Sequence, residues 1–440
     1  MPTALALLLA SFLPVAGGSD WPQFRGPLGT GAVAQAAVPL EWSSTTNVAW
    51  QVALPGQGWS QPVVVGDTVY VTAAVGEGLE KPMGMAAGVA DPRTMAAGTA
   101  PDLTVDWRVL ALDLATGKER WSVSAARGKP VHPIHPSNTY ATETPCADAD
   151  GVYAFFGATG TLAAFDTAGK PRWKQELGAH PVMQGYGTAS SPAIDAGRVF
   201  VQCYSEDSAF LAAFDAKSGK ELWRVAHDAN STSWSSPLLW HNQKRVELVS
   251  SADRLITSLD PATGKELWRI AGVYGPSSCS FGADAERLYF GQRSPMANPP
   301  LYALEAGGSG DLSPAGGASD VKLQAWSQKN ASPGFSSPVS VDGLLYLVSE
   351  NLLTCRDAAT GEQISKERVG DLVTVVASPI VIGDKLLLLD EEGRAAFVQV
   401  GPELELVGGG KLDDVFWSTP SVAGKSLLLR GVEKLYCIRG

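Results

Sequence analysis

One phrase recurs along this chain, and its first full copy reads Ala111-Leu112-Asp113-Leu114-Ala115-Thr116-Gly117-Lys118-Glu119-Arg120-Trp121. Alternating apolar residues favour a strand, and Asp-x-x-Thr-Gly favours a turn in which Asp accepts backbone hydrogen bonds and Gly takes a positive φ. The Trp lies on the strand that follows, so each copy predicts a β-hairpin. Further copies, the last of them incomplete, span Ala164–Trp173, Ala213–Trp223, Ser258–Trp268 and Asp357–Gly361.

A second landmark precedes each hairpin. A small polar residue and Pro start a strand, and an aromatic or apolar residue stands eight positions after the Pro. Eight such units follow one another with a period of roughly 45 residues, which indicates a repeat architecture. Two hairpins per unit give four strands, the content of a propeller blade. The pairs are Pro62/Tyr70, Pro145/Tyr153, Pro192/Phe200, Pro338/Tyr346, Pro379/Leu387 and Pro420/Leu428, with Pro237 (one residue longer) and Phe281/Tyr289 (Pro replaced) as variants.

The eighth unit is short. It starts at Pro420 and ends at Gly440, after about three strands. Asn47–Val52, near the other end of the chain, resembles the Trp-bearing strand Glu221–Val225. We therefore expect an all-β fold: an eight-bladed β-propeller of four-stranded antiparallel blades, whose last blade is closed by the N-terminal strand beside Tyr436. Closure of this kind removes the exposed edges of an open array.

Large Trp side chains are expected to pack between adjacent blades. Six of the eight units carry one, and Ser365 and Val407 lie near the corresponding place in the other two. The six are Trp50, Trp121, Trp173, Trp223, Trp268 and Trp326.

Composition narrows the function classes. The chain has 440 residues, of which 18% are charged, with a net charge of −11 and a pI near 5.0. Nucleic-acid binding normally requires a basic patch, so we expect no nucleic-acid partner. The five cysteines are scattered and odd in number, which argues against a disulfide framework. A propeller forms one closed unit despite its length, so residues 19–440 are predicted to be a single domain.

The first residues predict export. Met1–Leu13 is apolar but too short to span a membrane, and Ala16-Gly17-Gly18 offers small residues for cleavage. We interpret residues 1–18 as a signal peptide, although its start lacks Lys and Arg, so a buried or frayed terminus stays an alternative. No Cys lies near the cleavage point to form a lipobox, and no other stretch reaches transmembrane length. The expected location is periplasmic or secreted.

Insertions mark the expected binding face. Gly76–Asp106 and Ala125–Thr142 fall on the face that carries the loops between blades, and Gln292–Pro300 falls on the same face. The Gly-rich run Ala306–Ser319 falls on the opposite face and is predicted to be a flexible loop. Elaborated loops on a rigid scaffold commonly carry binding sites. Met83, Met85 and Met95 in the first insertion are either a soft contact patch or part of a low-complexity loop.

Polar and aromatic residues precede the inner strands. Small hydroxyl pairs such as Ser235-Ser236 recur there, with one carboxylate, Glu143. One interpretation is an aromatic-walled pocket with hydroxyl donors for a planar ligand or a peptide. The alternatives are that the hydroxyls cap strand starts, that the aromatic residues pack between blades, and that Glu143 is a solvated carboxylate. The aromatic residues at this position are Trp59, Trp234, Phe335 and Trp417.

A second candidate cluster is His132-Pro133-Ile134-His135, followed by Tyr140, with Tyr186 in the next inter-blade loop. His-x-x-His can ligate a metal, but no third ligand is suitably spaced, and we predict no metal site. Contact with a substrate or partner and a plain surface loop stay open. We find no phosphate-binding loop and no catalytic motif.

The recurring Asp-x-x-Thr-Gly-Lys-x-x-Trp phrase resembles that of the pyrroloquinoline-quinone (PQQ) propeller family over residues 20–440. The opening Asp20–Pro27 resembles a planctomycete-type branch described as PQQ-binding-like β-propeller repeat proteins. Quinoprotein alcohol dehydrogenases of this family hold the quinone between a Trp and a disulfide of adjacent cysteines, beside calcium. This chain has no adjacent cysteines. The outer-membrane assembly lipoprotein of the same family only binds partners, but it carries a lipobox Cys that is missing here.

The resemblance therefore implies a non-catalytic extracytoplasmic propeller that binds a protein partner or ligand on the inserted face, without a cofactor. The alternative is a PQQ-binding protein or PQQ-dependent dehydrogenase that uses calcium, with Trp59, Trp234 or Trp417 as the stacking floor.

Overall fold

The structure is a computed structural model that describes residues 20–84, 98–228, 232–292, 299–315 and 320–440. The predicted signal peptide, Met85 and Met95 lie outside these residues. No helix in the described part of the chain is long and apolar enough to cross a membrane.

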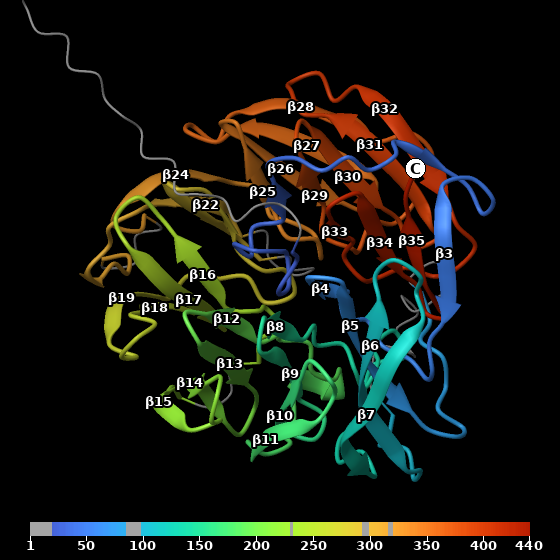
Figure 1. Cartoon of the computed structure of the whole chain (residues 1–440). Coiled ribbons are helices and arrows are strands. Elements are labelled where there is room, and N and C mark those ends of the chain that lie inside the picture. Colours follow the sequence, from blue (N-terminus) through green and yellow to red (C-terminus); the bar gives the residue numbers. More distant parts are fainter. Residues whose placement is uncertain (1–19, 85–97, 229–231, 293–298, 316–319) are drawn as a thin grey trace, which may run out of the picture.

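The described residues form eight sheets, each built on four antiparallel strands, that stand side by side around a common centre (Figure 1). Each of the repeat units recognised in the sequence gives one sheet, and we number the sheets 1 to 8 by their inner strands. Sheets 1 to 4, from the inner to the outer strand, are β4 (Val63–Val65), β5 (Thr68–Val75), β6 (Val105–Asp113), β7 (Glu119–Gly128); β8 (Cys146–Asp148), β9 (Gly151–Phe156), β10 (Thr161–Asp166), β11 (Pro171–Glu176); β12 (Ala193–Asp195), β13 (Arg198–Tyr204), β14 (Ala209–Asp215), β15 (Glu221–Ala226); and β16 (Leu238–His241), β17 (Val246–Ala252), β18 (Leu255–Leu259), β19 (Glu266–Ala271).

Sheets 5 to 8 follow the same plan, and three short strands are added at sheet edges. The sheets are β20 (Gly282–Ala283), β21 (Arg287–Phe290), β22 (Leu301–Glu305), β24 (Gln324–Gln328); β25 (Val339–Val341), β26 (Leu344–Ser349), β27 (Leu352–Asp357), β28 (Gln363–Arg368); β29 (Ile380–Ile382), β30 (Lys385–Leu389), β31 (Arg394–Gln399), β32 (Leu406–Lys411); and β33 (Ser421–Ala423), β34 (Ser426–Arg430), β35 (Lys434–Ile438), β3 (Val48–Ala53). The additions, all parallel to their neighbours, are β1 (Ala32–Val33) on β29, β2 (Glu41–Trp42) on β32 and β23 (Gly310–Asp311) on β19.

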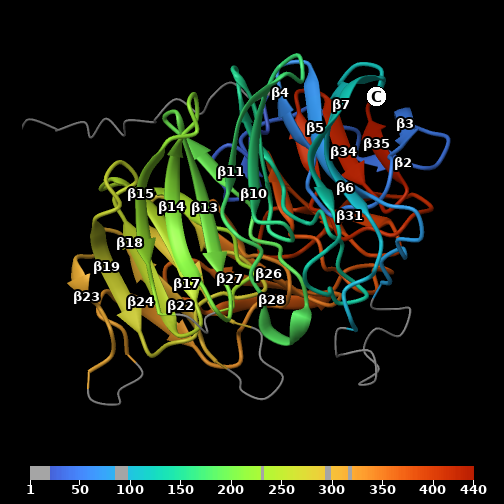
Figure 2. The ribbon, with the colours of Figure 1, turned by 90° about the horizontal axis from the view of Figure 1, so that it is seen from below.

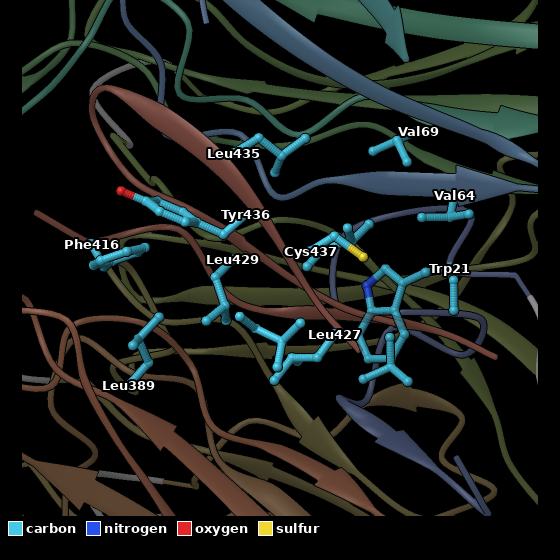
Figure 3. Close-up of a cluster of buried hydrophobic side chains, with 14 of the residues drawn as sticks. Trp21, Val64, Val69, Leu389, Phe416, Leu427, Leu429, Leu435, Tyr436 and Cys437 are labelled. Carbon is cyan, nitrogen blue, oxygen red and sulfur yellow. The ribbon is translucent and has the colours of Figure 1, made fainter. Parts of the chain in front are cut away.

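The two ends of the chain meet in sheet 8. Strand β3 pairs antiparallel with β35, and Trp50 lies opposite Cys437 while Gln51 lies opposite Tyr436. The predicted closure by the N-terminal strand is confirmed. Figure 3 shows the core beside this joint, where Trp21 and Val64 from the start of the chain pack with Leu427 and Tyr436 from its end.

Hydroxyl groups join the inner strands of neighbouring sheets. The Ser or Thr before each inner strand accepts a hydrogen bond from the backbone amide of the equivalent residue in the preceding sheet. The last joint uses a side-chain amide instead, because Gln61 Nε2 donates to the carbonyl of Pro420 at 2.6 Å. These hydroxyl groups therefore satisfy buried backbone amides at the strand starts, which agrees with the alternative that the hydroxyls are strand caps. The amide-to-hydroxyl pairs are Gln61–Thr144, Thr144–Ser191, Ser191–Ser236, Ser236–Ser280, Ser280–Ser337, Ser337–Ser378 and Ser378–Thr419.

The recurring Trp explains the recurring Gly. In five of the six cases the indole covers the Gly of the turn in the next sheet, and its Nε1 donates to a carbonyl of the same turn, at 2.9 Å from Trp173 to Ala216. A side chain on that Gly would collide with the ring. The exception is Trp268, whose Nε1 donates to Glu247 of its own sheet at 2.6 Å and whose ring lies against Gly308. The predicted packing of Trp between neighbouring sheets is confirmed at five joints: Trp50 on Gly117, Trp121 on Gly169, Trp173 on Gly219, Trp223 on Gly264 and Trp326 on Gly361.

We predict that Gly219→Ala destabilises the fold more than Gly197→Ala. Both glycines have a φ of +73°, so both substitutions strain the backbone equally. At Gly219 the new Cβ would lie 2.5 Å from Trp173, whereas at Gly197 nothing lies within 4 Å. The additional loss should be about 1–3 kcal/mol in the free energy of unfolding, measured by denaturant titration. Equal losses would contradict the role assigned to the Trp–Gly contact.

The structure adds one contact that the sequence did not predict and corrects one expectation. Sheet 7 lacks a Trp of its own, with Val407 in the expected region, but Trp42 of β2 packs over Gly410 and meets Phe397 edge-on at 5.8 Å. The Gly-rich run Ala306–Ser319 is described as far as Ala315, and its start lies beside a hairpin turn as predicted, since the amide of Ala306 donates to the carbonyl of Glu286. However, Gly310–Asp311 forms β23 against β19, so the flexible-loop prediction is wrong for these residues. Both contacts have the same cause, since the outer strand of a sheet has an unpaired edge to which a further short strand can bind.

The N-terminal segment Asp20–Val33 fills the centre of the ring. Its hydrogen bonds reach the inner strands of sheets 1, 2, 3 and 7, through Val64, Ala147, Ile194 and Val381. Arg25 extends the segment to sheets 5 and 6 by donating to Phe281 and Pro338. No repeat or motif of the sequence predicts this central segment.

Candidate functional site

The two ends of the ring of sheets carry different kinds of loops. We call loop face the end that carries the connections between sheets and the turns between second and third strands, and hairpin face the opposite end. The short helix η3 (Met183–Gly185) lies on the loop face, at the lower edge of Figure 2. As predicted, the first two insertions meet on this face, where the amide of Met83 donates to Pro136 at 2.9 Å. Lys129 and Asp102, one from each insertion, also form an ion pair.

The structure brings Trp59 and Trp417 together. Their rings stack with centroids 5.8 Å apart and planes 17° from parallel. Trp59 Nε1 donates to the carbonyl of Ser137 at 2.9 Å, and Trp417 Nε1 donates to Glu391 at 3.2 Å. The two residues come from the loops before sheets 1 and 8, so closure of the ring creates this contact.

The same loops continue the aromatic surface. His135 meets Tyr186 edge-on at 5.1 Å, and Tyr186 stacks on Trp234 at 6.1 Å. His135 Nδ1 also lies 2.7 Å from Ser137 Oγ, which connects this group to Trp59. We call Trp417, Trp59, His135, Tyr186 and Trp234 the aromatic arc. Burial lowers the pKa of His135, so its ring is neutral at pH 7.

The remaining candidates support this arc or lie apart from it. Tyr140 is buried and donates from its hydroxyl to the carbonyl of His132 at 3.2 Å. His132 Nε2 lies 3.3 Å from the carbonyl of Ala179, so the two histidines face different partners. Phe335 is partly buried in the loop before β25. Within the described residues, no group of three or more His, Cys, Asp or Glu side chains is arranged to hold a metal ion.

Glu143 lies beneath the loop face and is not solvated. It is 1% exposed, and its Oε1 accepts hydrogen bonds from the amide of Gly157 at 3.1 Å and from Thr188 Oγ1 at 2.5 Å. The solvated-carboxylate alternative is therefore wrong. Burial raises the pKa of Glu143, and the hydrogen bonds oppose that shift without cancelling it.

We predict that Glu143→Gln stabilises the protein at neutral pH. At low pH the carboxyl is protonated in both states. As the pH rises, the unfolded state ionises first, so the free energy of unfolding falls until the raised folded pKa is passed. Gln keeps an acceptor for Gly157 and Thr188 but removes this dependence, with a gain of about 1.4 kcal/mol for each unit by which the pKa is raised. Unfolding titrations from about pH 4 to about pH 8 test this. Parallel curves for the two proteins would contradict it.

The described residues do not match the quinone site of the family's dehydrogenases. Trp59 and Trp417 each cover one face of the other's ring, and Tyr186 covers one face of Trp234. All five cysteines are free, and no two are adjacent, so none supplies the disulfide half of the sandwich.

Comparisons with known proteins place the chain in a family. A family model described as outer membrane protein assembly factor BamB matches residues 32–201 and 105–292, together more than half of the chain. Among curated proteins, the serine/threonine-protein kinase AfsK of Streptomyces griseus is 32% identical over 133 residues, which are 29% of this chain and 14% of the kinase. The chain thus spans only a small part of that relative.

Solved structures share the fold at low identity. BamB from Moraxella catarrhalis has a TM-score of 0.58 and 15% identity, covering 89% of this chain and 99% of its own. A europium-containing methanol dehydrogenase has a TM-score of 0.59 and 12% identity, covering 94% and 90%. The quinohemoprotein alcohol dehydrogenase ADHIIG from Pseudomonas putida HK5 has a TM-score of 0.59 and 11% identity, covering 96% and 80%. The family match shows that this chain belongs to the PQQ-like β-propeller repeat family whose model is described as outer membrane protein assembly factor BamB.

Proposed function

We propose that this chain is a non-catalytic, extracytoplasmic binding protein: a closed propeller whose eight sheets are its blades and whose loop face engages a protein partner. The aromatic arc carries the proposal. Its five rings come from loops of different sheets and are fixed by ring contacts and hydrogen bonds. Trp59 is only 6% exposed and supports the other four rings, which are partly exposed and make a rigid surface on one face. Rigid aromatic side chains are typical anchors of protein interfaces.

Exposed apolar side chains near the arc favour a protein over a small ligand. Met83, Val131, Met183 and Val373 are large, exposed and placed in loops of the loop face. Two cavities between the sheets are small, with volumes of about 10 Å³ and about 20 Å³. A surface of this kind is suited to contact over an area rather than to enclosure of a ligand. The description of the family as an outer membrane protein assembly factor supports a location outside the cytoplasm.

Site-specific crosslinking tests the face. Met183 on the loop face and Leu222 on the outer strand β15 are both 44% exposed, so they form a matched pair. A photoreactive amino acid at Met183 should give a discrete adduct with one protein in the cells that make this chain, and the same amino acid at Leu222 should give none. Adducts from Leu222 alone, or equal adducts from both, would refute the proposed face.

Titration with PQQ tests the absence of quinone chemistry. Because another ring covers one face of each indole of the arc and the cysteines are apart, we expect no red shift of the quinone absorbance with or without calcium. Dye reduction with alcohol substrates should stay at background. A saturable shift that depends on calcium would overturn the non-catalytic assignment.

A further inference from the structure

A small pocket lies at the end of the aromatic arc, between sheets 2 and 3. Its walls include the apolar side chains of Phe155, Val182 and Tyr204 and the polar residues Ser190 and Gln202. Thr188 also lines it and follows Gly187, whose carbonyl accepts the bond from Trp234 Nε1. Lining residues that are partly exposed, such as His180, open the pocket to the loop face. The volume of about 20 Å³ admits one group of the size of a water molecule.

Two buried oxygen atoms of this pocket lack hydrogen-bond partners among the described residues. They are Oε1 of Gln202, which is 1% exposed, and Oγ of Ser190, which is 7% exposed. The Gln202 amide is held in place because its Nε2 donates to Ser235 at 2.7 Å, so Oε1 is the atom left over. Buried polar atoms are almost always paired in native proteins, so two such atoms in one pocket point to a missing donor.

The pocket selects the chemistry of that donor. An amide oxygen only accepts hydrogen bonds, and an ammonium group presents three N–H donors in the volume of a water molecule. A guanidinium is planar and larger, so it fits poorly. Apolar walls suit the aliphatic stem of a lysine, which packs along apolar surface while its head makes polar contacts.

The surrounding charge is also favourable. Glu143 lies behind the pocket and bonds to two lining residues, Gly157 and Thr188. Glu206 and Asp207 are exposed next to it, and Asp207 pairs with His180 of the rim. The whole chain carries a net charge of −11, so a basic segment of a partner is attracted to it.

We propose that this pocket binds the ammonium group of a lysine side chain of the partner, with Gln202 and Ser190 as acceptors and the aromatic arc as the adjoining platform. The inference rests on the proposed function, since it names the residue by which a protein would engage the loop face.

A peptide selection tests the pocket with the full chain. The probes are decapeptide libraries with a fixed central lysine, arginine or norleucine between randomised residues, captured on immobilised protein. We expect lysine to be enriched at least tenfold over both norleucine and arginine. Ser190→Ala and Gln202→Leu should reduce this preference to near unity, whereas Ser365→Ala on the outer strand β28 should keep it. If Gln202→Leu unfolds because it loses the bond to Ser235, the lysine preference of Ser190→Ala alone tests the pocket.

The outcomes separate the two proposals. Equal enrichment of lysine and arginine, or a lysine preference unchanged by Ser190→Ala, would overturn the pocket and leave it the site of a structural water. If no library is enriched while Met183 still crosslinks to a partner, the pocket proposal fails and the binding face stands. If lysine selection depends on Ser190 but Met183 gives no adduct, the pocket stands and the proposed partner face fails.

Discussion

Arg25→Met should lower the free energy of unfolding by about 3–5 kcal/mol, because three buried carbonyls lose a charged donor and each buried acceptor left unsatisfied costs about 1–3 kcal/mol. The guanidinium is 1% exposed at the centre of the ring. It donates to the carbonyl of Phe281 at 2.6 Å, to that of Thr30 at 2.8 Å and to that of Pro338. Met fills a similar volume but leaves these three carbonyls without their donor. Because the carbonyls belong to sheets 5 and 6 and to the central segment, the loss loosens the joint between distant parts of the chain.

Chemical denaturation measures the effect, and Arg269→Met is its control. Arg269 is exposed and pairs with Glu266 on an outer strand, where an ion pair is worth about 0–1 kcal/mol. Burial lowers the pKa of Arg25 to about 10, so the group stays charged at pH 7 and the comparison is between a charged and a neutral side chain. Equal losses for the two variants would show that the central segment is not held by Arg25.

The sheets were predictable because each copy of the repeat contains the residues that determine its turn and its contact with the next sheet. Asp-x-x-Thr-Gly sets a turn, the Trp sets a contact with the next sheet, and Gly219 accepts that contact. Even the pairing of Trp50 beside Tyr436 followed from counting strands, since a closed ring leaves one place for a spare strand. Each of these inferences needs only a few neighbouring residues and the period.

The central segment was not predictable for the opposite reason. Asp20–Val33 has no period, and Arg25 binds backbone carbonyls, which every residue carries. Nothing in the sequence of sheets 5 and 6 therefore indicates this partner. Trp42 was missed in the same way, because its place against Gly410 depends on a parallel pairing of β2 with β32 that has no sequence signal.

The candidate site was predictable in part. The position before the inner strands correctly located Trp59, Trp234 and Trp417 on the loop face. Which rings touch was not predictable, since Trp59 and Trp417 are far apart in sequence and meet only when the ring closes. Gln202 was not singled out because it lies within a strand pattern, and only its unpaired Oε1 in the folded structure draws notice.

A disulfide between Ala53 and Lys434 should stabilise the protein more than a disulfide that closes a short loop. These residues lie opposite each other on β3 and β35, and directly opposed antiparallel residues are within the Cα distance of a disulfide. In the Ala53→Cys/Lys434→Cys variant the bond closes a loop of about 380 residues, which should add up to about 6 kcal/mol to the free energy of unfolding, measured between oxidised and reduced forms. The reason is that the bond holds two distant parts of the chain together and so lowers the conformational entropy of the unfolded state.

The matched control is Leu352→Cys/Arg368→Cys, which joins an opposed pair on β27 and β28. Its loop of about 15 residues should add only about 3 kcal/mol. The native cysteines are free in both variants, so mass analysis of the oxidised protein identifies the engineered bond. If the two bonds stabilise equally, the two ends of the chain already lie close together in the unfolded state. If the longer loop gives the larger gain, the ends separate freely in the unfolded chain, and pairing of β3 with β35 has to bring them together again each time the ring forms.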